Sequence, residues 1–222
     1  MHEIADRSYL IERTRSEFLA DGVILCIRLR RREEVLEACR AALSGGLRIL
    51  EITLTTPGAL DVIETLASEG KALVGGGTVL SADDARAVAA RGGHFALSPV
   101  FDPEVVDEAH RLGLLAVPGT ATPREILAAH RHGARLVKVF PAGALGGPAY
   151  IRSVRGPLPD IPLIPTSGPS AQTLAEYMSA GAVAVGVGAE VFGPGYTPAS
   201  AEAAARRLRE AMDGCRRAAG AP

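Results

Sequence analysis

Several kinds of residue and segment are scarce in this chain of 222 residues, and each scarcity argues against a class of protein or of binding site. There is no Trp, aromatic residues make up 4%, and the three Cys lack the spacing of a disulfide framework or a zinc site. No apolar run is long enough to cross a membrane, and charged residues interrupt the first 21 positions, where a secretory signal would lie. The net charge of −1 argues against nucleic acid or an anionic membrane as a partner. We therefore expect a cytoplasmic protein with free, buried thiols.

Lysine is the scarcest charged residue: 22 of the 24 basic side chains are Arg, and the two Lys are Lys71 and Lys138. Lys71 lies in a polar turn, whereas Lys138 lies inside the apolar run 136–140. Burial disfavours the charged form of an amine, and a neutral Lys can form a Schiff base with a carbonyl, which Arg cannot do. Two interpretations stay open at this point. Lys138 is either an amine nucleophile or a structural residue, at a sheet edge or in a buried ion pair.

The five His residues do not form a metal-ligand set; they are His2, His94, His110, His130 and His132. His130 and His132 are two positions apart near the end of a predicted helix, so they lie on different faces. We interpret them as cations at a helix C-terminus and expect no bound metal.

Short apolar runs rich in β-branched residues recur along the chain, with helical segments between them. The eight runs are Val23–Arg28, Leu47–Thr53, Ala72–Gly77, His94–Ser98, Leu114–Pro118, Arg135–Phe140, Ile161–Thr166 and Ala182–Val187. The helical segments include Arg32–Leu43, Ala59–Ser68, Ala82–Arg91, Pro103–Arg111, Pro123–His132 and Ala171–Ala180. Most runs follow a Gly that would end a helix, namely Gly46, Gly70, Gly93, Gly113, Gly133 and Gly181. Such strands, joined by helices, predict a parallel sheet covered on both faces.

Eight such units predict an α/β fold, a (β/α)8 TIM barrel. The alternative is a doubly wound open sheet, but its Gly-rich fingerprint is absent after the first strand, where the chain reads Leu29–Arg32. We expect a single domain over residues 1–222, with an N-terminal capping helix that carries Tyr9, Leu10 and Phe18 on its apolar side. Its three parts are the N-terminal helix 1–21, the barrel core 22–192 and the C-terminal helix 193–222.

Polar residues at strand ends are the candidates for chemistry, because barrel enzymes act at the carboxyl ends of their strands. Glu51, Thr53 and Thr55 share one face of the second predicted strand, since side chains alternate along a strand. Glu51 is either a structural ion-pair partner of Lys138 or a general acid/base beside an amine nucleophile. The sequence leaves both interpretations open.

Small residues follow several of the predicted strands. Gly75–Gly77 precede Thr78, and glycines there suit either a tight turn or the close approach of a ligand. Thr166–Gly168 follow the seventh strand and Gly186–Gly188 the eighth. In barrels these two loops often bind phosphate through backbone N–H groups, so they predict a phosphate site.

Taken together, these stretches resemble a known family of class I aldolases. The matching stretches are Val23–Arg28, Glu51–Gly58, Gly75–Leu80, Ser98–Pro99, Val137–Gly143, Gly146–Ile151, Pro165–Thr166 and Gly186–Gly188. They resemble the aldolases that cleave 2-keto-3-deoxy-6-phosphogluconate (KDPG) and 4-hydroxy-2-oxoglutarate (KHG). The resemblance implies a TIM barrel, a small 2-keto acid phosphate as substrate, a homotrimer, and no cofactor. It implies cleavage of KDPG to pyruvate and glyceraldehyde 3-phosphate, and also of KHG to pyruvate and glyoxylate.

The resemblance also implies roles for individual residues. Lys138 matches the Schiff-base lysine and Glu51 the general acid/base. Thr78 matches a residue that holds the pyruvate carboxylate, Phe140 one that orients the pyruvyl group, and Thr166 one that acts at the aldehyde end. Further expected substrate-binding residues are Arg28, Thr55, Pro99, Ser167, Gly168, Gly186, Val187 and Gly188.

The chain departs from the family pattern at three places. Some members have Arg where Thr55 stands. The loop that usually reads Pro-Thr-Gly-Gly continues here as Ser167-Gly168-Pro169, and Pro169 has no N–H to donate. Ala189 stands where many members have a phosphate-binding Ser. Two of the three departures therefore fall at the phosphate end of the predicted site.

Other functions remain open from the sequence. One is an aldolase for the galactonate epimer of KDPG, or for KHG with little need of phosphate. Another is a non-catalytic barrel that binds phosphosugars. The presence of Lys138 in a chain that otherwise uses Arg argues against this alternative. A barrel isomerase or epimerase has no need of an amine on the sixth strand.

Overall fold

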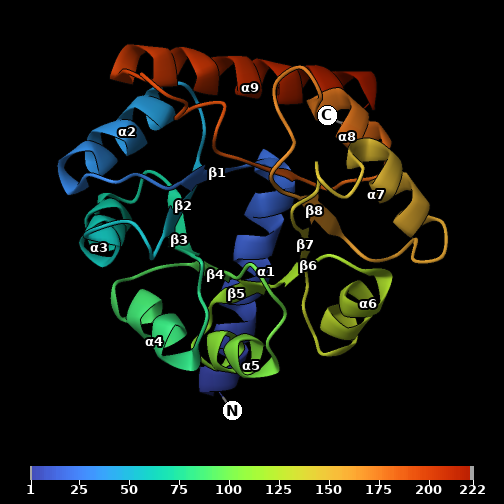
Figure 1. Ribbon diagram of the computed structural model, residues 1–222. Coiled ribbons are helices and arrows are strands. Elements are labelled where there is room, and N and C mark those ends of the chain that lie inside the picture. The colour runs from blue at the N-terminus through green and yellow to red at the C-terminus, as the bar shows by residue number, and fades with distance from the viewer. Residues whose placement is uncertain (1, 221–222) are drawn as a thin grey trace.

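Strands and helices alternate along the chain in the computed structural model, which describes residues 2–220. The strands are β1 (Val23–Ile27), β2 (Ile49–Thr53), β3 (Leu73–Gly77), β4 (Phe95–Leu97), β5 (Leu115–Val117), β6 (Gly119–Thr120), β7 (Val137–Val139), β8 (Leu163–Pro165) and β9 (Val185–Val187). The helices are α1 (His2–Asp21), α2 (Arg32–Ser44), α3 (Ala59–Glu69), α4 (Ala82–Ala90), α5 (Pro103–Arg111), α6 (Pro123–Arg131), α7 (Gly147–Arg155), α8 (Leu174–Ser179) and α9 (Pro198–Ala218). Figure 1 shows the strands at the centre and most helices around them.

All of the strand pairs between residues 2 and 220 are parallel, which confirms the predicted α/β fold. The strands form a six-stranded sheet in the order β5-β4-β3-β2-β1-β9 and a three-stranded sheet in the order β6-β7-β8. The prediction of a closed barrel needs a correction, because the ladder of hydrogen bonds is not one continuous ring. Pro118, which has no N–H to donate, separates β5 of the larger sheet from β6 of the smaller one, and an isolated bridge between Thr166 and Gly186 links the ends of β8 and β9.

Alternate strand residues pack on opposite sides of the strands, as the period of two requires. Val23, Leu25 and Ile27 of β1 belong to the larger buried cluster, which the surrounding helices complete. Ile24 of the same strand belongs to a second cluster with residues of the other strands and with Phe18 of α1. This second cluster fills the space that the strands enclose, on the side where α1 lies.

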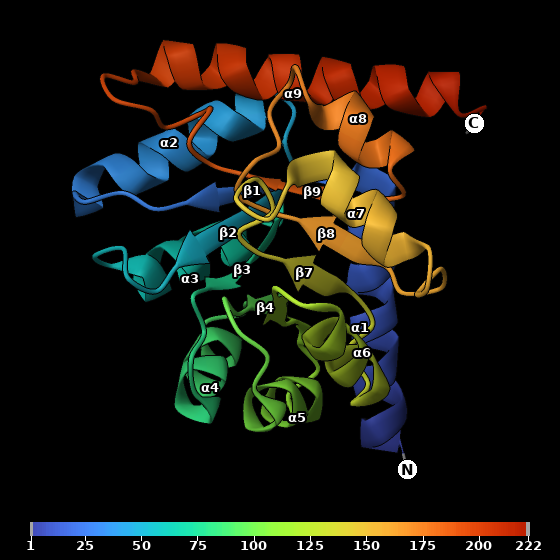
Figure 2. The same ribbon diagram turned by 45° about the vertical axis from the view of Figure 1, so that its right-hand side comes forward.

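Helix α1 covers one end of the strands, and it contacts β5 and α5. Figures 1 and 2 show it behind and beside the strands. Its buried residues include Ile11 and Phe18, and the Phe18 ring meets the Phe95 ring edge-on with centroids 4.9 Å apart. The predicted apolar side is right for Phe18 but wrong for Tyr9 and Leu10, which are 66% and 46% exposed. The buried stripe instead follows helical spacing from Ile11 to Phe18, which turns the other two side chains outward.

Replacing Phe18 with Ala should lower the free energy of unfolding by about 3–5 kcal/mol, because it opens a cavity between α1 and the strand interior. Equilibrium denaturation in urea would measure the change. The matched control is Tyr9→Ala on the same helix, where an exposed side chain should change the value by about 0.5 kcal/mol or less. Equal effects of the two substitutions would contradict the packing described for α1.

The element bounds differ from the sequence predictions mainly at the ends. The predicted helix Ala171–Ala180 begins as α8 only at Leu174, since residues 171–173 form a turn after Pro169. Helix α7 and strand β6 were not among the predicted elements. The left-handed glycine that follows α4 is Gly92 rather than Gly93. The predicted segments 1–21 and 193–222 contain α1 and α9, and residues 1, 221 and 222 lie outside the described residues.

Between residues 2 and 220, no helix has both the length and the apolar character that a membrane span requires.

Candidate active site

A cavity of about 480 Å³ opens at the carboxyl ends of the strands. The residues that line it come from the ends of six strand regions and the loops after them. They are Cys26, Arg28, Thr78, Pro99, Lys138, Phe140, Thr166, Ser167, Gly186, Val187, Gly188, Ala189 and Phe192. Of the predicted site residues, Glu51, Thr55 and Gly168 do not line the cavity, and all the others do.

Lys138 lies in the middle of β7, between β6 and β8, so it is not an edge residue. Its N–H donates to the carbonyl of Pro118 at 2.9 Å, and its carbonyl accepts from the Thr120 hydroxyl at 2.9 Å. These bonds fix the backbone, and the side chain is only 6% exposed where it faces the cavity. The Nζ atom lies 5.3 Å from the centre of the Phe140 ring, close enough for a cation–π contact when the amine is charged.

Glu51 lies beneath the cavity on β2, and its side chain is 1% exposed. Its Oε1 atom lies 3.8 Å from the Nζ of Lys138, so the predicted proximity of the two residues is confirmed. Its Oε2 atom is buried and has no hydrogen-bond partner between residues 2 and 220. A buried carboxylate oxygen is costly without such a partner, so this atom is suited to accept a hydrogen bond from a hydroxyl group. A Cβ atom at Gly77 would collide with this carboxylate, and only glycine leaves room for it.

Arg28 stands at the mouth of the cavity, held between two threonine hydroxyls. Its Nη1 donates to Thr55 at 2.7 Å and its Nη2 to Thr78 at 3.0 Å. Thr55 therefore belongs to the site through Arg28, although it does not line the cavity. Thr78 has a φ of 58°, a left-handed conformation that is rare for a β-branched residue and typical of constrained functional positions. A guanidinium fixed in this way can bind a carboxylate through two parallel hydrogen bonds.

The loop after β8 is fixed by the loop after β7. The carbonyls of Thr166 and Ser167 accept from the N–H groups of Ala142 and Gly143, at 2.9 and 2.7 Å. Ser167 adopts a φ of 63°, although its side chain makes such a conformation unfavourable. Gly168 has a φ of 150°, and a Cβ atom there would crowd the hydroxyl of Tyr177.

Cys26 and Phe192 line the cavity but were not predicted as site residues. Burial raises the pKa of the Cys26 thiol, and the negative charge of Glu51 raises it further. The thiol therefore stays protonated at neutral pH and is a poor nucleophile. Cys26 stands two positions before Arg28 in the sequence, and this spacing indicated that both side chains point to the same side of β1. Phe192 is the last residue of the predicted barrel core, where no pattern indicated a site.

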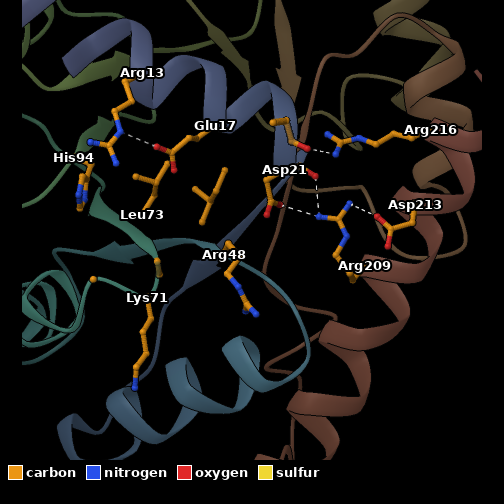
Figure 3. A pocket seen from close by; sticks show the side chains of 14 residues that line it. Arg13, Glu17, Asp21, Arg48, Lys71, Leu73, His94, Arg209, Asp213 and Arg216 are labelled. Atoms are coloured by element: carbon orange, nitrogen blue, oxygen red, sulfur yellow. Dashed lines mark hydrogen bonds and ion pairs between the residues drawn. The ribbon is translucent and has the colours of Figure 1, made fainter. Parts of the chain in front are cut away.

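A larger cavity, of about 670 Å³, lies at the other end of the strands, between α1 and α9. Figure 3 shows that its charged side chains mostly bind one another or helix-end carbonyls. Arg209 lies between Asp21 and Asp213, at 3.2 and 2.9 Å, and Arg216 donates to the carbonyl of Leu19. These contacts fasten the two helices together, and none of the predicted site residues lies there.

Between residues 2 and 220, no group of three or more His, Cys, Asp or Glu side chains is placed to hold a metal ion.

Comparison with known proteins bears on what this arrangement of residues does. The model of the family described as "KDPG and KHG aldolase" matches residues 16–201. The chain belongs to that family. The aldolase fold and the predicted resemblance are thereby confirmed, and the chain is similar to known lyases.

Individual relatives agree with the family assignment. The 2-dehydro-3-deoxy-phosphogluconate aldolase of Pseudoalteromonas atlantica is 39% identical, over 63% of this chain and 66% of the relative. The enzyme of the same name from Pseudomonas aeruginosa is 37% identical, over 71% of this chain and 72% of the relative. Both are more similar to this chain than the probable 2-dehydro-3-deoxy-6-phosphogalactonate aldolase of Rhizobium meliloti, which is 34% identical over 79% of this chain and 84% of the relative. The alternative of a galactonate aldolase is therefore not favoured.

Solved structures of the family have the same arrangement of elements. A structure titled "Native KDPGal structure" superposes with a TM-score of 0.82 at 28% identity, covering 88% of this chain and 96% of that chain. The KDPG aldolase of Legionella pneumophila, with pyruvate captured as a covalent carbinolamine, superposes with a TM-score of 0.75 at 28% identity, covering 89% and 95%.

Proposed function

We propose that this protein is a class I aldolase in which Lys138 forms a Schiff base with a 2-keto acid. Its substrates are KDPG, cleaved to pyruvate and glyceraldehyde 3-phosphate, and KHG, cleaved to pyruvate and glyoxylate. The observation that carries the proposal is the buried pair of Lys138 and Glu51, 3.8 Å apart at the base of a cavity. An amine nucleophile beside a carboxylate is the pair of groups that this chemistry requires.

The pyruvyl half of the substrate fits between Arg28 and Lys138 in the cavity. The C1 carboxylate would bind Arg28, whose guanidinium is fixed by Thr55 and Thr78. This would place the C2 ketone toward Lys138, with the ring of Phe140 beside it. The two cationic side chains that line the cavity, Arg28 and Lys138, are then both used by the pyruvyl half.

The reaction follows from these positions. The neutral amine of Lys138 attacks the C2 ketone, and loss of water gives an iminium ion. Glu51 removes the proton of the C4 hydroxyl, the C3–C4 bond breaks, and its electron pair moves to form an enamine. The aldehyde leaves, Glu51 returns a proton to C3, and hydrolysis of the iminium releases pyruvate and restores Lys138. Glu51 Oε2, which has no hydrogen-bond partner among residues 2–220, is the oxygen suited to these transfers.

Two further observations support the proposal. The Legionella pneumophila relative was captured with pyruvate as a covalent carbinolamine, the intermediate that precedes an iminium. Thr166 and Pro99 also line the cavity, and the aldehyde half would lie beside them. A homotrimer stays a prediction of the family resemblance, and a cytoplasmic location stays a prediction of the composition.

Borohydride trapping with pyruvate tests the proposal. The reduced adduct should appear in the intact mass, and peptide mapping should place it on Lys138 and not on Lys71. A folded protein that gives no adduct, and that binds phosphosugars without cleaving them, would favour the non-catalytic barrel instead.

Replacing Gly77 with Ala should lower kcat by about 10- to 100-fold, because the new methyl group displaces the Glu51 carboxylate from Lys138. Steady-state cleavage with coupled detection of pyruvate would measure it. Gly214→Ala in α9 is the matched control, since a Cβ atom there meets only the end of an Arg217 side chain, 4.0 Å away. Unchanged kcat in Gly77→Ala, with the fold intact, would argue against a catalytic Glu51.

A further inference from the structure

The aldehyde end of the cavity lies between the loop after β8 and the loop after β9. A phosphate at such a place is normally bound by backbone N–H groups at the start of the helix that follows. In this chain those groups are already used or missing. Pro169 has no N–H, the N–H of Ser170 donates to the Thr173 hydroxyl at 3.0 Å, and the N–H of Ala171 donates to Glu190 Oε2 at 2.8 Å. The carboxylate of Glu190 thus takes a position that suits an anion.

The side chains of the loop after β9 add no cation. Glu190 follows Ala189 and precedes Phe192 by two positions, and both of those residues line the cavity with apolar side chains. Phe192 is held by an edge contact with Tyr196, with ring centroids 5.3 Å apart. The cations that line the cavity are Arg28 and Lys138, which the pyruvyl half uses. A phosphate dianion at this end would therefore meet no cation of its own, and the Glu190 carboxylate belongs to the residue next to Ala189 of the cavity wall.

The backbone of the loop after β8 is held in place by its neighbours. The carbonyls of Thr166 and Ser167 are bound by Ala142 and Gly143. Gly168 has a φ of 150°, which favours glycine, and packs closely against Gly143 and the Tyr177 hydroxyl. The position of the loop is thus set by its neighbours and not by a ligand.

We propose that Glu190 is a specificity-determining residue that weakens the binding of phosphate at the aldehyde end. This inference rests on the proposed aldolase function and narrows its substrate class. The enzyme gains little from the phosphate of KDPG, and it cleaves unphosphorylated 2-keto-3-deoxy sugar acids, whose aldehyde product is uncharged, with similar efficiency.

The test compares KDPG with 2-keto-3-deoxygluconate, which differs from it only in lacking the phosphate. We expect the native enzyme to favour KDPG by less than about tenfold in kcat/KM. Glu190→Gln should raise kcat/KM for KDPG roughly tenfold and leave the value for the unphosphorylated substrate nearly unchanged. The amide oxygen of Gln can still accept from Ala171, so the loop keeps its hydrogen bond.

The control is Glu176→Gln, which removes the same charge from an exposed position in nearby α8 and should leave both values unchanged. Inhibition by inorganic phosphate provides a second readout, and it should be stronger for Glu190→Gln than for the native enzyme. A native preference for KDPG of 100-fold or more, or an unaltered substrate ratio in Glu190→Gln, would overturn the inference while leaving the aldolase function standing. Failure to cleave either substrate, without a pyruvate adduct, would overturn both.

Discussion

Lys138→Arg is expected to lower kcat/KM for KDPG by at least about 10³-fold. Arg keeps a positive charge but cannot form an iminium ion, so only noncovalent binding remains. The fold should survive, because Lys138 meets β6 and β8 through its backbone, and those hydrogen bonds do not depend on the side chain.

The chain itself offers the matched control. Lys71→Arg changes the other lysine, whose side chain is 73% exposed and lies 3.9 Å from Glu69. This variant should keep both turnover and the pyruvate adduct, whereas Lys138→Arg should lose both. Steady-state kinetics and borohydride trapping on the two variants measure the difference. Turnover above about a tenth of the native rate in Lys138→Arg would rule out Schiff-base catalysis by this residue.

The sequence predicted that Glu51 and Lys138 lie close together, for a physical reason. A charged residue inside an apolar strand, such as Lys138 or Glu51, is costly unless it has a function or a partner, so its presence is informative on its own. The period of two then places residues of one strand on a common side, and parallel strands bring their carboxyl ends together. These rules were enough to predict that Glu51 and Lys138 lie close together.

The aldehyde end was not predictable in the same way. The hydrogen bond from Ala171 to Glu190 joins two loops whose spacing no repeat controls, and loop geometry depends on contacts that sequence patterns do not encode. The same limit applies to α1, where Tyr9 and Leu10 are large, mainly apolar side chains like Phe18 but face outward. Which stripe of an amphipathic helix is buried depends on what it packs against, and the strand interior is assembled from distant segments.

Glu51→Gln separates the two interpretations of the buried carboxylate that the sequence left open. If Glu51 is the general acid/base, Gln should lower kcat by about 10²- to 10⁴-fold, because it cannot take or return the proton at C4 and C3. If Glu51 is only the structural partner of Lys138, the variant should lose stability but keep its rate. We expect the first result, and Glu64→Gln, which removes an exposed carboxylate paired with Arg91, is the control for the change in charge.

A measurement that needs no aldehyde makes the distinction sharper. Pyruvate bound as an enamine exchanges its methyl protons with solvent, so the rate of deuterium incorporation in heavy water reports proton transfer at C3 alone. Glu51→Gln should slow this exchange by about the same factor as kcat, while the borohydride adduct still forms on Lys138, though more slowly. Because the carboxylate lies 3.8 Å from Nζ and Oε2 has no hydrogen-bond partner among residues 2–220, proton transfer should depend on Glu51. Native exchange rates in Glu51→Gln would mean that another group moves the proton, and Glu51 would then be a residue that positions Lys138.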